Sequence, residues 1–150
     1  MGQQQLLLLV LATVIVGLAT VAGIQAFEQG QTRANQDALT NTAVKVASDI
    51  QARIKEPSQF GGYDGSMSDA TGTNGISSIS EFGYTTNSNG KYETSNGTCE
   101  IGSTGSLSAP DDVNSTNIKV LCSSDKNEVV AWVDGTNPDD IVSRAKTVGS

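Results

Sequence analysis

The side chains best suited to covalent chemistry are two cysteines, Cys99 and Cys122, in a chain of 150 residues that has no histidine. Two thiols without histidine cannot complete a four-thiolate or mixed zinc site. Histidine-based catalytic dyads and triads are excluded too, since histidine most often transfers protons near neutral pH. We therefore predict a single Cys99–Cys122 disulfide, which favours an oxidising, extracytoplasmic location.

No other set of side chains has the pattern of a catalytic or metal site. The sequence offers no nucleophile with a base, no phosphate-binding glycine loop and no pair of acids in apolar surroundings. The doublets Asp111-Asp112 and Asp139-Asp140 lack the alternating oxygen ligands of a calcium loop, so solvated or helix-capping acids are favoured. We expect a protein that is not an enzyme and has no cofactor or bound metal.

Two segments fit the sequon for N-linked sugars, Asn96-Gly97-Thr98 and Asn114-Ser115-Thr116. Asn96 and Asn114 are therefore candidate glycosylation sites. Ordinary polar turns are the favoured alternative at both positions, because asparagine, glycine and serine are common turn residues.

Charge narrows the choice of partners. Nine Lys and Arg against sixteen Asp and Glu give a net charge of −7, which repels a phosphate backbone, so we expect no nucleic-acid partner. The acidic surplus fits either ordinary solubility or a high-salt habitat, and the sequence leaves both open. Only 37% of the residues are hydrophobic and 5% aromatic, which is little for a self-sufficient core.

The chain begins with an uncharged, largely apolar segment. No residue from Met1 to Phe27 is charged, and seventeen of the twenty-two residues from Leu6 to Phe27 are apolar. As a helix these twenty-two residues would be about 33 Å long, close to the ~30 Å hydrocarbon core of a bilayer. The run is longer than that of a secretory signal and has no basic residue before it. We take residues 1–27 as a transmembrane or filament-core helix of the mature chain.

The helix is expected to continue through residues 28–56 with a different character. This stretch has no proline and one glycine, and its apolar residues recur at helical spacing, forming one stripe. Pro57 should end the helix. One face would then pack on a small domain while the other faces carry polar side chains. The stripe consists of Leu39, Ala43, Val46, Ile50 and Ile54.

Residues 57–150 predict a β-rich surface domain with one small antiparallel sheet. The fold class is thus α+β, with a long N-terminal helix packed on this sheet. Residues 61–75 have few large apolar side chains and are expected to lie over the helix or over another subunit. The predicted strands are Phe82–Thr86, Lys91–Thr94, Thr98–Ile101, Ile118–Cys122 and Glu128–Asp134.

Turn and cap signals complete the predicted domain. Asn87–Gly90 and Asn96-Gly97 are expected hairpin turns. A short helix is predicted from Asn137 to about Lys146, since Pro138 and two acids follow Asn137. Two inward-facing sets fit the last two strands, and the register between them is open. One set is Val120, Cys122, Val129, Ala131 and Val133, and the other is Leu121, Val130 and Trp132.

Together, the opening Met1-Gly2-Gln3-Gln4-Gln5-Leu6, the apolar and then amphipathic helix to about residue 56, and a β-rich domain with one disulfide resemble the type IV pilins and their relatives. The helix match covers about a third of the chain, and the remainder matches in architecture. The sequence departs from the family pattern at Gln5, where a glutamate is usual, and has no proline near position 22. Cleavage of a leader and methylation of Met1 are left open.

The resemblance implies a structural subunit that polymerises through its N-terminal helix into an extracellular, cell-surface filament used for adhesion, motility or surface attachment. The implied partners are identical subunits in a helical filament, the inner membrane before assembly and the pilus assembly machinery. The alternatives are a secretion-system pseudopilin and a monomeric, membrane-anchored extracellular binding module. The expected filament-core interface is Met1, Gln3, Gln4, Gln5, Leu6, Leu9, Val10, Val14, Leu18, Val21 and Phe27.

Gln5 raises the question of what satisfies a buried amino terminus. In the family, a buried carboxylate at this position is thought to attract the amine of a neighbouring subunit, and glutamine cannot do so ionically. Gln3, Gln4 and Gln5 can instead supply neutral hydrogen bonds, since each amide both donates and accepts. Glu28 of a neighbouring subunit is the alternative partner. We favour the glutamine network.

Overall fold

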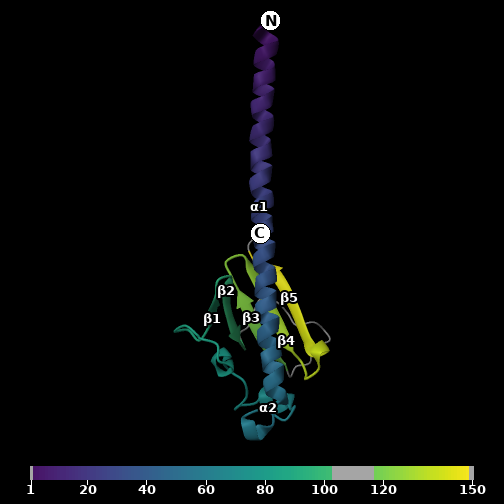
Figure 1. Ribbon diagram of the computed structural model, residues 1–150, viewed down its shortest axis with the longest axis vertical. Helices are drawn as coiled ribbons and strands as arrows, with labels where there is room; N and C mark the ends of the chain where they lie inside the picture. The colour runs from purple at the N-terminus through teal and green to yellow at the C-terminus, as the bar shows by residue number, and fades with distance from the viewer. Residues whose placement is uncertain (1, 103–116, 149–150) are drawn as a thin grey trace. The chain divides into compact units, whose positions relative to one another are not determined.

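The computed structural model describes residues 2–102 and 117–148. The chain divides into two compact units, one ending at Ala34 and one beginning at Asn35, and each is described by itself. The elements, labelled in Figure 1, are α1 (Gly2–Lys55), η1 (Ser58–Phe60), α2 (Met67–Ala70), η2 (Ile79–Phe82), β1 (Tyr92–Thr94), β2 (Gly97–Ile101), β3 (Ile118–Ser123), β4 (Asn127–Val133), η3 (Pro138–Asp140) and β5 (Ile141–Thr147).

The long helix is confirmed as one element of 54 residues. It ends at Lys55, two residues before Pro57, whose ring cannot enter the helical hydrogen-bond ladder. The first unit, which ends at Ala34, contains the apolar part of α1. The second unit contains the last turns of α1 together with the β-rich domain.

The predicted stripe on α1 forms the centre of the second unit. Leu39, Ala43, Val46, Ile50 and Ile54 are all 0% exposed. Spacings of three and four residues bring them to one side of the helix, so they can pack together against a sheet. The amphipathic pattern in residues 28–56 therefore identified the packing face of α1 correctly.

The sheet has five strands in the order β1-β2-β3-β4-β5, each antiparallel to its neighbour. Alternation along each strand separates its side chains into two sets. Both sets proposed from the sequence are buried, on different sides. The set packed in one core cluster with the α1 stripe is Val120, Cys122, Val129, Ala131 and Val133, and the set in a separate cluster is Leu121, Val130 and Trp132.

The predicted disulfide joins β2 to β3. Cys99 and Cys122 are paired in the strand register, with their Cα atoms 4.1 Å apart, and both are fully buried in the main core cluster. The bond therefore fixes the pairing of two strands through cysteines that are 23 residues apart in sequence. Because the sheet unit has few large aromatic residues, a covalent link at its centre supplements a small apolar core.

We expect reduction of this disulfide to lower the free energy of unfolding of the second unit by about 3 kcal/mol, since the reduced unfolded chain regains the entropy of an open loop. Urea unfolding of the full chain with and without reductant measures this change. The Cys99→Ala/Cys122→Ala variant is the control, because reductant should not affect it. Two freely alkylated thiols in the unreduced protein would contradict the bond.

The predicted C-terminal helix is wrong. Pro138 does open a helical turn, in which the Asp140 side chain accepts a hydrogen bond from the backbone N–H of Asn137, but η3 ends at Asp140. The chain then forms β5, which pairs with β4 along its whole length from Ile141 to Thr147. Pairing with a buried neighbouring strand here outweighs a local helix-start signal.

The hairpin predicted around Asn87–Gly90 is present only as a turn. The N–H of Gly90 bonds the carbonyl of Asn87, Gly90 has φ of 75°, and one isolated bridge joins Thr86 to Tyr92. The strand predicted at Phe82–Thr86 is wrong, because Phe82 ends the helical turn η2. The Ser78 and Glu81 side chains cap that turn reciprocally.

The glycine-rich segment 61–75 was expected to lie over the helix or over another subunit. In the structure it lies over the helix. Ala70, Ile76 and Ile79 are buried in the same core cluster as the α1 stripe. Backbone hydrogen bonds also attach the segment to the end of α1, including one from the N–H of Gly65 to the carbonyl of Ile54. Ala70 within the segment, and Ile76 and Ile79 just after it, therefore anchor a segment that has little apolar surface of its own.

Polar side chains of α1 fix the helix to the sheet loops. The Asn35 amide donates to the carbonyl of Asn96, and its oxygen accepts from the side chains of Ser124 and Asn127. At the other end of the helix, Gln51 donates to two carbonyls of the β4–β5 loop. These bonds attach both ends of the helical segment 35–55 to turns of the sheet.

A tyrosine attaches the segment before β1 to the side of α1. The Tyr84 hydroxyl donates to the Asp49 carboxylate, and its ring lies 4.7 Å from that of Tyr92. Burial, followed by the Asp49 hydrogen bond and charge, raises the pKa of Tyr84 well above its usual range. The neutral form is thus favoured in the folded state, so this stabilisation is complete below about pH 10 and is lost at higher pH.

Candidate assembly surface

The first unit exposes an unusual amount of apolar side chain. Thirteen large apolar residues between Leu6 and Phe27 are each 52–70% exposed. Soluble monomers rarely leave contiguous apolar patches of this kind in water. The helix is also long and apolar enough to cross a membrane, judged by length and composition. Its surface therefore requires lipid or other apolar helices around it.

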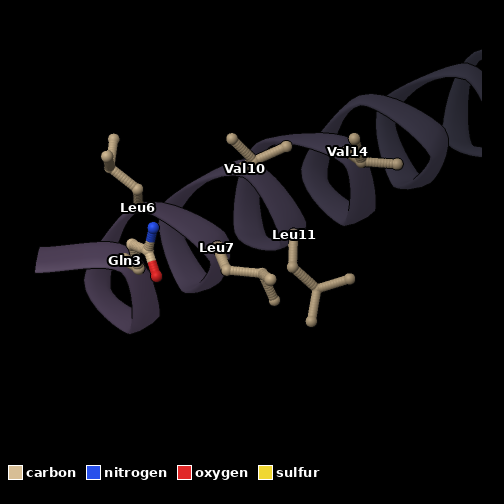
Figure 2. A pocket seen from close by; sticks show the side chains of 6 residues that line it. All are labelled: Gln3, Leu6, Leu7, Val10, Leu11 and Val14. Carbon is tan, nitrogen blue, oxygen red and sulfur yellow. The ribbon is translucent and has the colours of Figure 1, made fainter.

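Figure 2 shows how the side chains near the start of α1 are arranged. Leu6, Val10 and Val14 follow one row along the helix, and Leu7 and Leu11 follow the next row. A shallow groove runs between the two rows, with the Gln3 amide at its N-terminal end. Rows spaced by four residues are the ridges that insert into the grooves of a neighbouring helix.

The structure brings together part of the predicted interface. Gln3, Leu6, Val10 and Val14 line this one groove. Leu7 and Leu11 line it too but were not among the predicted residues, although their four-residue spacing was visible in the sequence.

The remaining predicted positions are spread along the helix. Gln4, Gln5, Leu9, Leu18, Val21 and Phe27 are exposed on α1, and Met1 lies outside the described residues.

Polar groups within the apolar part of α1 are largely satisfied by the helix itself. The Thr13 hydroxyl donates to the carbonyl of Val10, and the Thr20 hydroxyl donates to the carbonyl of Gly17. These internal bonds remove the cost of placing a threonine hydroxyl in apolar surroundings. Apart from the nearby backbone of α1 itself and the adjacent residues, no described atom lies within 4 Å of the place where a Cβ of Gly17 or Gly23 would stand, so another helix could approach closely there.

The candidate sugar sites have different outcomes. Asn96 lies in the tight turn between β1 and β2, is half-buried, and uses its backbone carbonyl to accept the Asn35 hydrogen bond. Asn114 lies outside the described residues.

Of the two acidic doublets, Asp111 and Asp112 lie outside the described residues. Asp140 of the second doublet caps a helical turn, as the sequence predicted, because its carboxylate accepts hydrogen bonds from the N–H and the side chain of Asn137.

Comparison of the chain with protein-family models, curated proteins and solved structures finds no match. The elements predicted from the sequence are present, namely one long helix with an apolar first part, an antiparallel sheet and one disulfide.

Proposed function

We propose that this protein is a pilin-like structural subunit, without enzymatic activity, that polymerises through its N-terminal helix into an extracellular filament. The observation that carries the proposal is the exposure of thirteen large apolar residues on a helix that the rest of the described chain leaves uncovered. Burying each such side chain contributes about 1.5–3 kcal/mol. Several copies packed helix against helix could cover this surface once it leaves the membrane.

The continuity of α1 supports a filament subunit over a simple membrane anchor. One helix contains both the apolar residues and the stripe that packs on the sheet, with no linker between them. A separate anchor and binding module would more usually be joined by a flexible, polar segment.

A membrane-anchored binding module is the second candidate, because the same apolar segment could remain in lipid. A secretion pseudopilin is a variant of the filament proposal, since it would use the same helix packing. Under the filament proposal, the inner membrane holds the subunit before assembly and the pilus assembly machinery extracts it. The disulfide supports exposure of the sheet unit outside the cytoplasm.

Detergent removal tests the proposal directly. We expect the purified full-length chain to form sedimenting, thin filaments of uniform diameter in negative-stain images when detergent is dialysed away without lipid. Amorphous aggregates in the absence of lipid, together with full reconstitution as dispersed monomers when lipid is supplied, would instead support the anchored module. Far-UV circular dichroism before dialysis confirms that the starting material is folded.

The glutamines near the start of α1 give a further prediction. We expect Gln5→Leu to weaken assembly by about 1–3 kcal/mol per subunit. The reason is that the amino terminus, buried in the filament core, would lose the side-chain amide of Gln5 as a hydrogen-bond acceptor. Glu28→Gln should have little effect. The critical concentration for assembly measures both variants. A defect confined to Glu28→Gln would show that a neighbouring carboxylate, and not the glutamine network, satisfies the amino terminus.

A further inference from the structure

β5 is the most exposed strand of the sheet. Every residue from Ser143 to Thr147 is exposed. Among the residues that the structure describes, β5 pairs with β4 on one side and with no strand on its other side. The opposite edge of the sheet is better protected, since Thr86 bridges to Tyr92 of β1. An uncovered edge presents backbone N–H and C=O groups to a partner.

This edge carries a basic strip, which we define as Lys126, Arg144 and Lys146. Arg144 and Lys146 are exposed on β5, and the carbonyl of Lys126 accepts from the N–H of Val148 at the end of the strand. Neither ion pair formed within residues 2–102 and 117–148 involves these three cations. The acids close to the strip are Glu128, opposite Lys146 in the register, with Asp125 and Asp37 at the same end of the unit.

The other end of the second unit is acidic. Hydrogen bonds place its loops beside the last turns of α1, since Gly65 bonds Ile54 and Gln51 bonds the β4–β5 loop. Figure 1 shows α2 at this end of the helix. Its two cations are Arg53, paired with Glu56, and Lys55. The six carboxylates of this acidic end are Glu56, Asp64, Asp69, Asp134, Asp139 and Asp140.

We propose that the basic strip on β5 binds the acidic end of a second copy of this chain, as a contact between sheet units that supplements helix packing. Its place within a filament rests on the function proposed above. Lys126 and Lys146 lie toward the Asn35 end of the helical segment 35–55, which is about 30 Å long at ~1.5 Å per residue, and the acidic end lies at its other end. Arg144 is at the middle of β5. The acidic end of the same copy is therefore too far away to reach Lys126 and Lys146, although Glu128 of the same copy stands opposite Lys146.

The signs of charge also fix the symmetry of the contact. Two basic strips repel each other, as do two acidic ends, so the attractive arrangement joins unlike surfaces of successive copies. Such a heterologous contact leaves one unused surface at each end of a row of copies. The row either closes into a ring or grows as an open polymer. The edge N–H groups of β5 can add hydrogen bonds to the partner's carboxylates. A contact of this kind weakens as salt screens the charges.

Two charge-reversal variants of the full chain test this contact. Arg144→Glu/Lys146→Glu reverses the strip, and Asp69→Lys/Asp139→Lys reverses the acidic end at two exposed positions. We expect each variant alone to raise the critical concentration for filament assembly about tenfold at low salt, since exposed ion pairs are individually weak but several are lost together. An equimolar mixture of the two variants should assemble at nearly the wild-type concentration, because each reversed surface then meets its complement.

Matched controls separate charge position from net charge. Lys55→Glu makes the net charge more negative by two units, half the change of the double strip variant, but at the acidic end, so it should not raise the critical concentration. Unaltered thermal unfolding temperatures establish that the variants fold. Wild-type concentrations for both double variants, or defects that mixing does not rescue, would overturn the β5 contact. A wild-type chain that never forms filaments would instead overturn the proposed function itself.

Discussion

Val14→Asp or Leu18→Asp is expected to abolish filament assembly. Both side chains are exposed on α1, since Val14 is 53% and Leu18 69% exposed. Replacing them should therefore remove few contacts within the subunit. A carboxylate at either position would have to enter an apolar filament core, at a cost of about 2.5–3.5 kcal/mol or more for every subunit added. Sedimentation and negative-stain imaging after detergent removal measure the loss.

The matched control for this prediction is Val14→Ile, which keeps the position apolar and should assemble normally. Circular dichroism in detergent checks that the aspartate variants retain helix and sheet. Normal filaments from both aspartate variants would mean that α1 is not the assembly core. Loss of filaments in Val14→Ile as well would point to a packing requirement stricter than apolar character.

Ile50→Ala is expected to lower the free energy of unfolding of the second unit by about 2–5 kcal/mol. Ile50 is 0% exposed and belongs to the core cluster that includes Val120 and Val129 of the sheet. Truncation removes apolar contacts and leaves a cavity between helix and sheet. Urea denaturation followed by tryptophan fluorescence reports the loss, because Trp132 is buried in β4.

Asn41→Ala provides the comparison on the same helix. Asn41 is exposed, so this change should alter stability by less than about 0.5 kcal/mol. Equal losses from the two substitutions would contradict the assignment of one buried and one solvated face. A loss confined to Ile50→Ala supports the packing of the α1 stripe against the sheet, independently of any filament.

The sequence was most informative where one physical signal acted alone. The α1 stripe was predictable, because Leu39 to Ile54 repeat at helical spacing with polar residues between them and Pro57 ends the run. The cysteine pair was predictable because no histidine competes for a metal-binding role. The stripe predicts which face of the helix packs on the sheet, and the cysteine pair predicts a covalent link within the β-rich domain.

The parts that could not be predicted depend on contacts between distant residues. Asn137 and Pro138 begin a helical turn, yet the residues after Asp140 pair with all seven residues of β4, and no local pattern specifies that partner. The choice between the two inward sets also depended on register, which a shift of one residue would reverse. The charge difference between β5 and the loops beside Lys55 became visible only once the strand order was known.

A helical reconstruction of filaments sheared from cells, with the subunit identified by peptide mass, tests the central proposal most directly. We expect density for bundled α1 helices along the filament axis, with residues 6–27 of each copy buried among those of its neighbours and the sheet units outside. Filaments in which residues 6–27 contact no other subunit, or surface preparations that contain this chain only as dispersed, membrane-bound monomers, would contradict the account.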